Sequence, residues 1–124
     1  MKDNVNKNEF RRFLNAHENF YNRPISRVEH IYNNNGNAVR NQFRITTNDG
    51  EFFQSYKSII VFLDFKSGKT FLDVNKWDYS VTTGKYRNLF LGETKRETEK
   101  KIKSGEYILY DLNSNDALES AFFQ

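Results

Sequence analysis

Aromatic and apolar side chains recur every three to four positions near the start of the chain. Residues 7–21 are therefore predicted to form an amphipathic helix. Asn6 and Glu9 occupy the capping positions at its start, and Pro24 lies beyond its end. We expect this helix to cover a sheet with the stripe formed by Phe10, Phe13, Leu14, His17, Phe20 and Tyr21.

The pattern then changes to a period of two, which is typical of strands. Residues 27–32 predict a first strand, and the sequence NNNGN at 33–37 predicts a turn. A second, half-buried strand is expected at 39–47, where one face carries Val39, Phe43, Ile45 and Thr47. Asn48-Asp49-Gly50 predicts a tight hairpin turn, because Asp-Gly tolerates the positive φ that such a turn needs. Residues 51–56 are the expected return strand.

Three further strands follow from apolar runs. Residues 59–65 are almost entirely apolar, which predicts a central strand buried on both faces. Lys66-Ser67-Gly68 predicts a turn into a short strand at 69–73. Residues 106–112 predict the last strand.

The stretch KWDYSVTTGKYRNLFLGET, residues 76–94, predicts a strand that turns into a helix. By period two, Trp77 and Tyr79 share one face of that strand. Ser80 or Thr82 can cap the helix, and Gly92 can end it. The inward stripe of this helix is expected to be Tyr86, Leu89 and Phe90.

Two more helices are predicted after this corner. Thr94 to Glu97 form a capping box for a helix at 95–103, and Gly105 ends it. Its single aliphatic residue, Ile102, indicates that it lies largely in solvent. Asp116 can cap a short terminal helix that either packs in the core or forms a helix-in-groove or homodimer contact; its stripe is Ala117, Leu118, Ala121 and Phe122.

These elements predict an α+β fold with a mostly antiparallel sheet of about five to six strands and helices packed on one face. A length of 124 residues fits a single domain, residues 1–124. Within it we distinguish the N-terminal helix at 7–21, the core sheet and helix at 27–92, and the charged helix, strand and terminal helix at 93–124.

Composition excludes several kinds of site. The chain has no cysteine, which rules out disulfides, thiolate metal sites and cysteine nucleophiles, and fits a reducing compartment. The longest apolar run, Ile59 to Leu63, is too short to cross a bilayer, and no signal peptide is evident. We therefore expect a cytoplasmic protein with no membrane contact.

The charge is modest and unevenly distributed. The net charge is +3; residues 1–47 hold eight Lys or Arg against four Asp or Glu, whereas residues 104–124 hold four acidic residues and no basic one. A basic body of this kind can bind a polyanion. The candidate residues for binding a partner or nucleic acid are Arg11, Arg12, Lys85, Arg87, Lys95, Arg96, Lys100 and Lys101.

Alternatives stay open for the two main groups of candidates. Lys85 and Arg87 follow free amides and hydroxyls at a helix N-terminus, which suits an anion or partner site, but the same stretch also fits a capped corner with an aromatic core. The lysines of helix 95–103 suit phosphate binding. The i,i+4 pairs Glu97–Lys101 and Glu99–Lys103 favour a solvated, self-paired helix instead.

One pattern suggests an enzyme. Asp64 and Lys66 end a buried strand, as the acid and lysine of a magnesium-dependent nuclease do. No Pro-Asp pair accompanies them, Asp49 falls in a turn, and an Asp before Ser-Gly is also ordinary turn chemistry. His17 and His30 have no metal-ligand spacing. We therefore expect a non-enzymatic protein with no catalytic, metal or cofactor site.

Residues 43–92 carry a resemblance. The segment Gln54-Ser55-Tyr56-Lys57-Ser58 is followed by a W-x-YS-x-TT-x-K corner and a helix that ends in Phe90-Leu91; the corner residues are Trp77, Tyr79, Ser80, Thr82, Thr83 and Lys85. This pattern resembles a small domain found in proteins of phages, plasmids and other mobile elements, some of which inhibit host defences such as CRISPR effector nucleases.

The resemblance implies a non-enzymatic inhibitor that occludes a host protein or ribonucleoprotein. A CRISPR effector nuclease is the specific partner it suggests. A small regulator that binds DNA or RNA is the alternative, and a nuclease using Asp64 and Lys66 is the third hypothesis.

Overall fold

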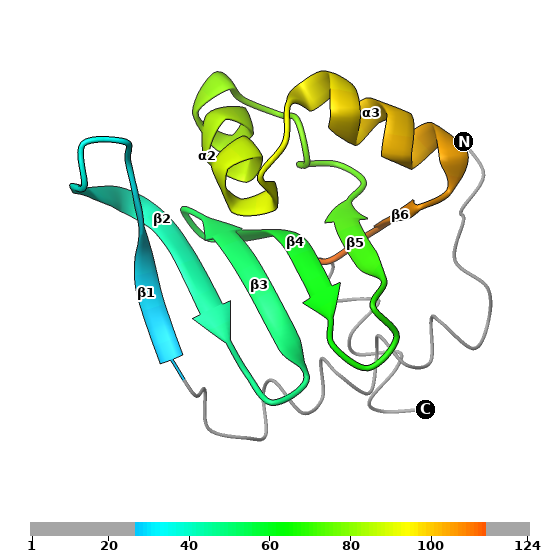
Figure 1. Cartoon of the computed structure of the whole chain (residues 1–124), viewed down its shortest axis with the longest axis horizontal. Coiled ribbons are helices and arrows are strands. Elements are labelled where there is room, and N and C mark those ends of the chain that lie inside the picture. The colour runs from blue at the N-terminus through cyan, green and yellow to red at the C-terminus, as the bar shows by residue number, and fades with distance from the viewer. Residues whose placement is uncertain (1–26, 114–124) are drawn as a thin grey trace.

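A computed structural model describes residues 27–113. Six strands form one sheet in which they follow each other in chain order (Figure 1). The strands are β1 (Arg27–Tyr32), β2 (Ala38–Thr46), β3 (Gly50–Ser55), β4 (Ser58–Asp64), β5 (Thr70–Asp73) and β6 (Tyr107–Tyr110). The first five pair antiparallel, and β6 lies parallel to β5.

Two helices cover one face of this sheet (Figure 1). They are α2 (Val81–Leu91) and α3 (Lys95–Ser104), and they connect β5 to β6. A parallel strand pair needs such a long crossover, because its two strands must run in the same direction. The prediction of an α+β fold with a mostly antiparallel sheet and helices on one face is thus confirmed. The helices expected at 7–21 and after Asp116 lie outside the described residues.

Both faces of the sheet carry buried side chains. On the helix face, Phe53 of β3 stacks on Phe90 of α2, with ring centroids 5.6 Å apart. On the opposite face, Phe62 lies between Phe52 and Phe71, with centroid distances of 4.6 and 5.9 Å. Because β4 contributes to both clusters, the prediction that it is a central strand buried on both faces is confirmed.

The hairpin between β2 and β3 forms where it was expected, but its glycine has a different role. The amide of Thr47 donates to the carbonyl of Gly50 across 2.9 Å. Positive φ occurs at other glycines and not at Gly50. A Cβ at Gly50 would instead lie 2.2 Å from the carbonyl oxygen of Leu63 on β4. The position needs glycine because two strands approach closely there.

The strand expected around Trp77 and Tyr79 is wrong, because residues 74–80 form turns. Asp73 ends β5: its carbonyl accepts the amide of Trp77 at 3.0 Å. Its carboxylate accepts the amides of Asn75 at 3.1 Å and Leu112 at 2.7 Å. These bonds fold the chain back at once, so residues 74–80 do not continue as a strand. Neither α2 nor α3 is long and apolar enough to cross a membrane.

Candidate binding groove on helix α2

Helix α2 begins at the predicted cap and is attached to the sheet by a buried hydroxyl pair. The Ser80 hydroxyl accepts the amide of Thr83 at 3.1 Å, as an N-cap residue does. The hydroxyl of Thr83 lies 2.8 Å from that of Ser55 on β3, and both residues are fully buried. The two segments that carry the sequence resemblance, one containing Ser55 and the other containing Thr83, are therefore in direct contact in the fold.

Arg87 is buried beneath α2, with a relative exposure of 1%. Its guanidinium donates to the carbonyl of Trp77, to the carboxylate of Asp78 at 3.3 Å and to the side-chain oxygen of Asn88 at 2.9 Å. It also lies 5.1 Å from the centre of the Trp77 ring. The expectation that Arg87 is available to a partner is therefore wrong. Its guanidinium instead binds the Trp77 carbonyl and the Asp78 carboxylate, and so holds the turns at 74–80 against α2.

The inward face of α2 also differs from the expected one. Thr83, Gly84, Arg87 and Phe90 are buried, whereas Leu89 is 40% exposed. The polar contacts of Thr83 and Arg87 rotate the helix so that Leu89 faces solvent. Phe90 remains on the inward side, with the guanidinium of Arg44 lying 4.5 Å from its ring centre.

Asp78 joins the turns to both helices. It binds Arg87 of α2 and the ammonium of Lys95 at the start of α3, the latter at 2.7 Å. Burial opposes ionisation of Asp78, but hydrogen bonds and charge from Lys95 and Arg87 outweigh it and lower its pKa. The hydrogen bond to Asp78 correspondingly raises the pKa of Lys95.

A second ionic cluster anchors α3 to β6. The carboxylate of Glu93 accepts from Lys101 at 2.7 Å, from the hydroxyl of Tyr107 at 2.8 Å and from the hydroxyl of Thr98. Burial disfavours the Glu93 charge, yet these three donors prevail and lower its pKa. Burial, followed by the hydrogen bond to Glu93, raises the pKa of Tyr107 to about 12. Lys101 thus pairs with Glu93 rather than with Glu97, whose carboxylate caps α3 through the Thr94 amide.

The outward face of α2 forms the floor of a groove of about 690 Å³. Lys85, Asn88, Leu89 and Gly92 follow the i, i+3, i+4, i+7 spacing of one helical face. Hereafter we call it the α2 groove; its other lining residues are Asn33, Asn34, Asn35, Glu93 and Thr94.

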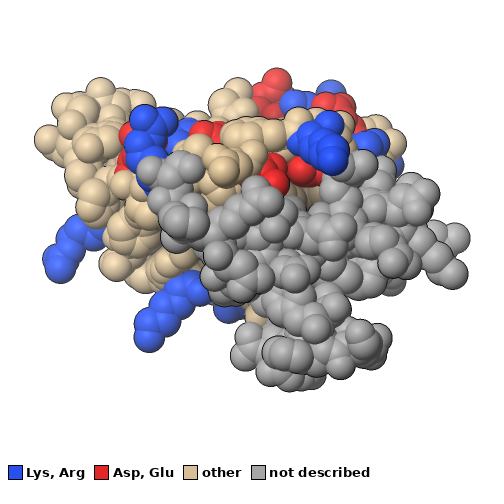
Figure 2. Space-filling view, turned by 90° about the horizontal axis from the view of Figure 1, so that it is seen from below, with Lys and Arg blue, Asp and Glu red and all other residues tan. Residues whose placement is uncertain are grey.

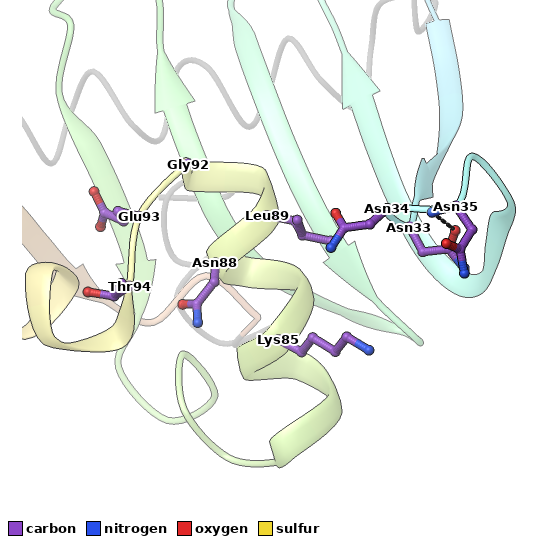
Figure 3. A pocket seen from close by; sticks show the side chains of 9 residues that line it. All are labelled: Asn33, Asn34, Asn35, Lys85, Asn88, Leu89, Gly92, Glu93 and Thr94. Carbon is purple, nitrogen blue, oxygen red and sulfur yellow. Dashed lines mark hydrogen bonds between the residues drawn. The ribbon is translucent and has the colours of Figure 1, made fainter.

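Two walls enclose the α2 groove (Figure 3). One is the turn between β1 and β2, where the side-chain oxygen of Asn33 accepts the amides of Asn35 at 2.9 Å and Asn37 at 3.0 Å. The other is the Glu93–Thr94 corner between α2 and α3. In Figure 3, Lys85 and Leu89 point from α2 toward the asparagine turn.

Charge in the α2 groove is set by Lys85. Glu93, the one carboxylate among the lining residues, is paired with Lys101. The ion pairs formed within residues 27–113 do not include Lys85, whose ammonium lies 5.4 Å from the Tyr86 ring centre. An anionic group that enters the groove therefore meets a cation that carries no competing carboxylate.

A smaller hollow of about 220 Å³ adjoins the α2 groove at Leu89, which lines both. It lies between β1 and α2, and its other lining residues are Glu29, His30, Ile31, Tyr32, Arg44 and Phe90. The two hollows together run from the α2–α3 corner to the edge strand of the sheet. The sequence did not reveal them, because their walls come from three separate segments.

The other predicted basic residues are spread over different surroundings. Arg11 and Arg12 lie outside the described residues. Lys95 and Lys101 bind carboxylates, whereas Arg96 and Lys100 are exposed on α3. On the described part of the face in Figure 2, basic side chains lie at several separate places, some of them beside acidic ones, rather than gathered into one field. The structure therefore brings Arg87 and Lys95 together around Asp78 but leaves Lys85 in a separate groove.

The Asp64–Lys66 pattern forms a turn. The carboxylate of Asp64 accepts from the Ser67 hydroxyl at 2.6 Å and from the Lys66 amide at 3.3 Å. The Gly68 amide closes the turn on the Asp64 carbonyl at 2.8 Å. The part of the chain at 27–113 holds no cluster of three or more acidic, histidine or cysteine side chains arranged for a metal. The turn interpretation of these residues is thus confirmed.

No curated protein and no solved structure matches this chain. A family of unknown function, DUF8033, matches residues 26–106. That range extends from the start of β1 to the residue before β6, so it contains both walls and the floor of the α2 groove. Because the match covers more than half of the chain, this protein belongs to the DUF8033 family.

Proposed function

We propose that this domain is a non-enzymatic binding module that engages a partner protein through the α2 groove and occludes part of it. The observation that carries the proposal is the groove itself. It presents a lysine that forms no ion pair within the described part of the chain, side-chain amides and an exposed leucine, on a helix that buried contacts hold in place. Surface grooves that offer apolar and polar contacts are a recurring way in which proteins bind a segment of a partner.

The partner class to test first follows from the sequence resemblance to mobile-element proteins. A host defence complex, with a CRISPR effector nuclease as the specific case, would be inhibited sterically when the groove binds it. The purified protein is then expected to slow DNA cleavage by such a nuclease, and the variant Leu89→Asp is expected to slow it much less. Unchanged cleavage in the presence of excess protein would remove this partner class.

The groove is tested without knowledge of the partner. The full chain and its Leu89→Asp variant are immobilised, and extracts of the natural host are passed over both. We expect at least one protein to be retained by the original chain and lost from the variant, as identified by mass spectrometry. The exposed apolar residue Val81, at the other end of α2, supplies the control Val81→Asp. Equal retention by all three proteins would contradict a role for the groove.

Binding of DNA or RNA is the second candidate. Arg96, Lys100 and Lys103 are exposed on α3 and form no ion pair with another residue of 27–113, whereas Lys95 and Lys101 are paired. A regulator of this kind would bind a DNA duplex alone, with affinity that falls steeply as salt rises. Fluorescence anisotropy at low and physiological salt measures this. Salt-independent affinity, or none, would exclude it.

A further inference from the structure

We propose that the segment recognised by the α2 groove is an extended, acidic stretch of the partner protein. A carboxylate of that stretch pairs with Lys85, and a neighbouring aliphatic side chain packs on Leu89. This inference rests on the proposed function, since it names the chemistry of the partner at the same groove.

Charge complementarity selects an acidic ligand. Lys85 is the one cation among the nine lining residues and forms no ion pair within residues 27–113, and the Glu93 charge is compensated by Lys101 at 2.7 Å. The side chain of Glu93 is only 5% exposed, so its oxygens point into the α3–β6 cluster rather than into the groove. A carboxylate at Lys85 therefore gains a charge-assisted hydrogen bond and meets no repulsion from an unpaired acid lining the groove.

The amide side chains suit a peptide backbone. Each peptide group offers one donor and one acceptor, and an asparagine amide can pair with both. Asn88 is oriented for this purpose: its oxygen accepts from buried Arg87 at 2.9 Å, which leaves its NH2 group to donate to a ligand carbonyl. Arg87 is thus a positioning residue for the α2 groove. Asn34 and Asn35 are exposed on the opposite wall.

The shape favours an extended segment. The hollow along β1 meets the α2 groove at Leu89, so a chain that crosses α2 there continues toward Tyr32 and His30. Leu89 is 40% exposed at this junction, where an aliphatic side chain of the ligand would cover it.

A nucleic acid fits the α2 groove less well. Phosphate backbones are bound by several converging cations, and single-stranded bases stack on exposed aromatic rings. The nine residues that line the α2 groove supply one cation and no aromatic ring; the rings of His30 and Tyr32 and the guanidinium of Arg44 lie only in the adjoining hollow. An acidic peptide needs only the one cation.

The test is a selection from a displayed library of random peptides, with the full chain as bait. We expect the original chain to enrich peptides that carry Asp or Glu beside Leu, Ile or Val. The variant Lys85→Glu is expected to enrich Lys or Arg at the same position instead. Lys66→Glu removes another exposed lysine, one that lies outside the groove, and should leave the selected pattern unchanged.

A binding measurement then follows with one enriched peptide. Lys85→Ala is expected to weaken its affinity about tenfold by calorimetry, because a charge-assisted bond is lost. Asn88→Asp should weaken it by a similar factor, since its NH2 donor becomes a repelling oxygen. Circular dichroism melting of each variant shows whether the fold is retained.

The outcomes separate the two proposals. Enriched peptides without acidic residues, or a pattern unchanged by Lys85→Glu, would overturn the acidic-segment inference and leave the binding module standing. No enrichment by the original chain, together with no protein retained from host extract, would overturn both. Retention of a single-stranded oligothymidine that Lys85→Glu abolishes would assign the groove to nucleic acid and would also overturn the inference.

Discussion

The hydroxyls of Ser55 and Thr83 lie 2.8 Å apart and are both fully buried, although 28 residues separate them in the chain. This pair attaches the first turn of α2 to β3 at the helix face of the sheet. Because the α2 groove lies on the other side of the same helix, the pair fixes the position of the groove floor relative to the asparagine turn.

Removing one hydroxyl of this pair is expected to destabilise the fold. Thr83→Val keeps the shape of the side chain but leaves the Ser55 hydroxyl buried without its partner, which costs about 1–3 kcal/mol of the free energy of unfolding. Thr82→Val changes the neighbouring exposed threonine and should cost less than about 0.5 kcal/mol. Urea denaturation of both variants measures the difference. Equal stabilities would show that the buried pair contributes nothing.

Replacement of Arg87 should loosen the turns before α2. Arg87→Met keeps most of the buried volume but leaves the Trp77 carbonyl without its donor and Asp78 with Lys95 alone. We expect the free energy of unfolding to fall by about 2–3 kcal/mol. This is less than the cost of breaking a fully buried ion pair, because Asp78 is partly exposed. Lys85→Met on the exposed side of the same helix is the control. Tryptophan fluorescence during unfolding reports on the single tryptophan, Trp77. A stability equal to that of the control would refute this role.

Acid is expected to weaken the attachment of α3. The pKa of Glu93 in the folded protein lies below its ordinary value of 4.5, so Glu93 stabilises the fold fully above that pH. As the pH falls below it, the unfolded chain binds the proton first and the free energy of unfolding decreases. Glu93→Gln should be less stable than the original chain at neutral pH and should lose less stability on acidification. Parallel stability-versus-pH curves for the two proteins would contradict this.

Two glycines should respond in opposite directions to alanine. Gly50→Ala would place a methyl group 2.2 Å from the Leu63 carbonyl, so we expect the β3–β4 pairing to shift, at a cost of about 1–3 kcal/mol. At Gly84 inside α2, the nearest atoms would lie at 3.7 Å, an ordinary contact. Gly84→Ala should therefore stabilise the protein by about 0.5–1 kcal/mol through its better helix propensity. Thermal unfolding of both variants measures the sign of each change, and a stabilised Gly50→Ala variant would refute the close approach.

The sequence alone determined the features that depend on near neighbours. Thr94 caps α3 and Gly92 and Gly105 end their helices as the sequence predicted, Ser80 is one of the two caps expected for α2, and β4 lies within one residue of the buried strand expected at 59–65. Each is specified within a short segment of the chain, because caps, turns and strand periodicity are local features.

The tertiary structure decided which residues are available to a partner. From the sequence Arg87 is expected to be available to a partner, but it is buried, and its terminal guanidinium nitrogens donate to the carbonyl of Trp77, the carboxylate of Asp78 and the side-chain oxygen of Asn88. Lys101 has an acid one turn away, yet it pairs with Glu93 outside its helix. In both cases the partner is set by how α2, α3 and the sheet pack.

The α2 groove is likewise a feature that only the tertiary packing decided. Its floor repeats at helical spacing, but its walls come from a hairpin turn some fifty residues earlier and from the next corner of the chain. The hydrophobic periodicity of a helix predicts which of its faces is exposed, but it does not predict which other segments lie beside that face. Of the binding residues expected from sequence, packing therefore left Lys85 in the groove and placed Arg87 beneath it, where it orients Asn88.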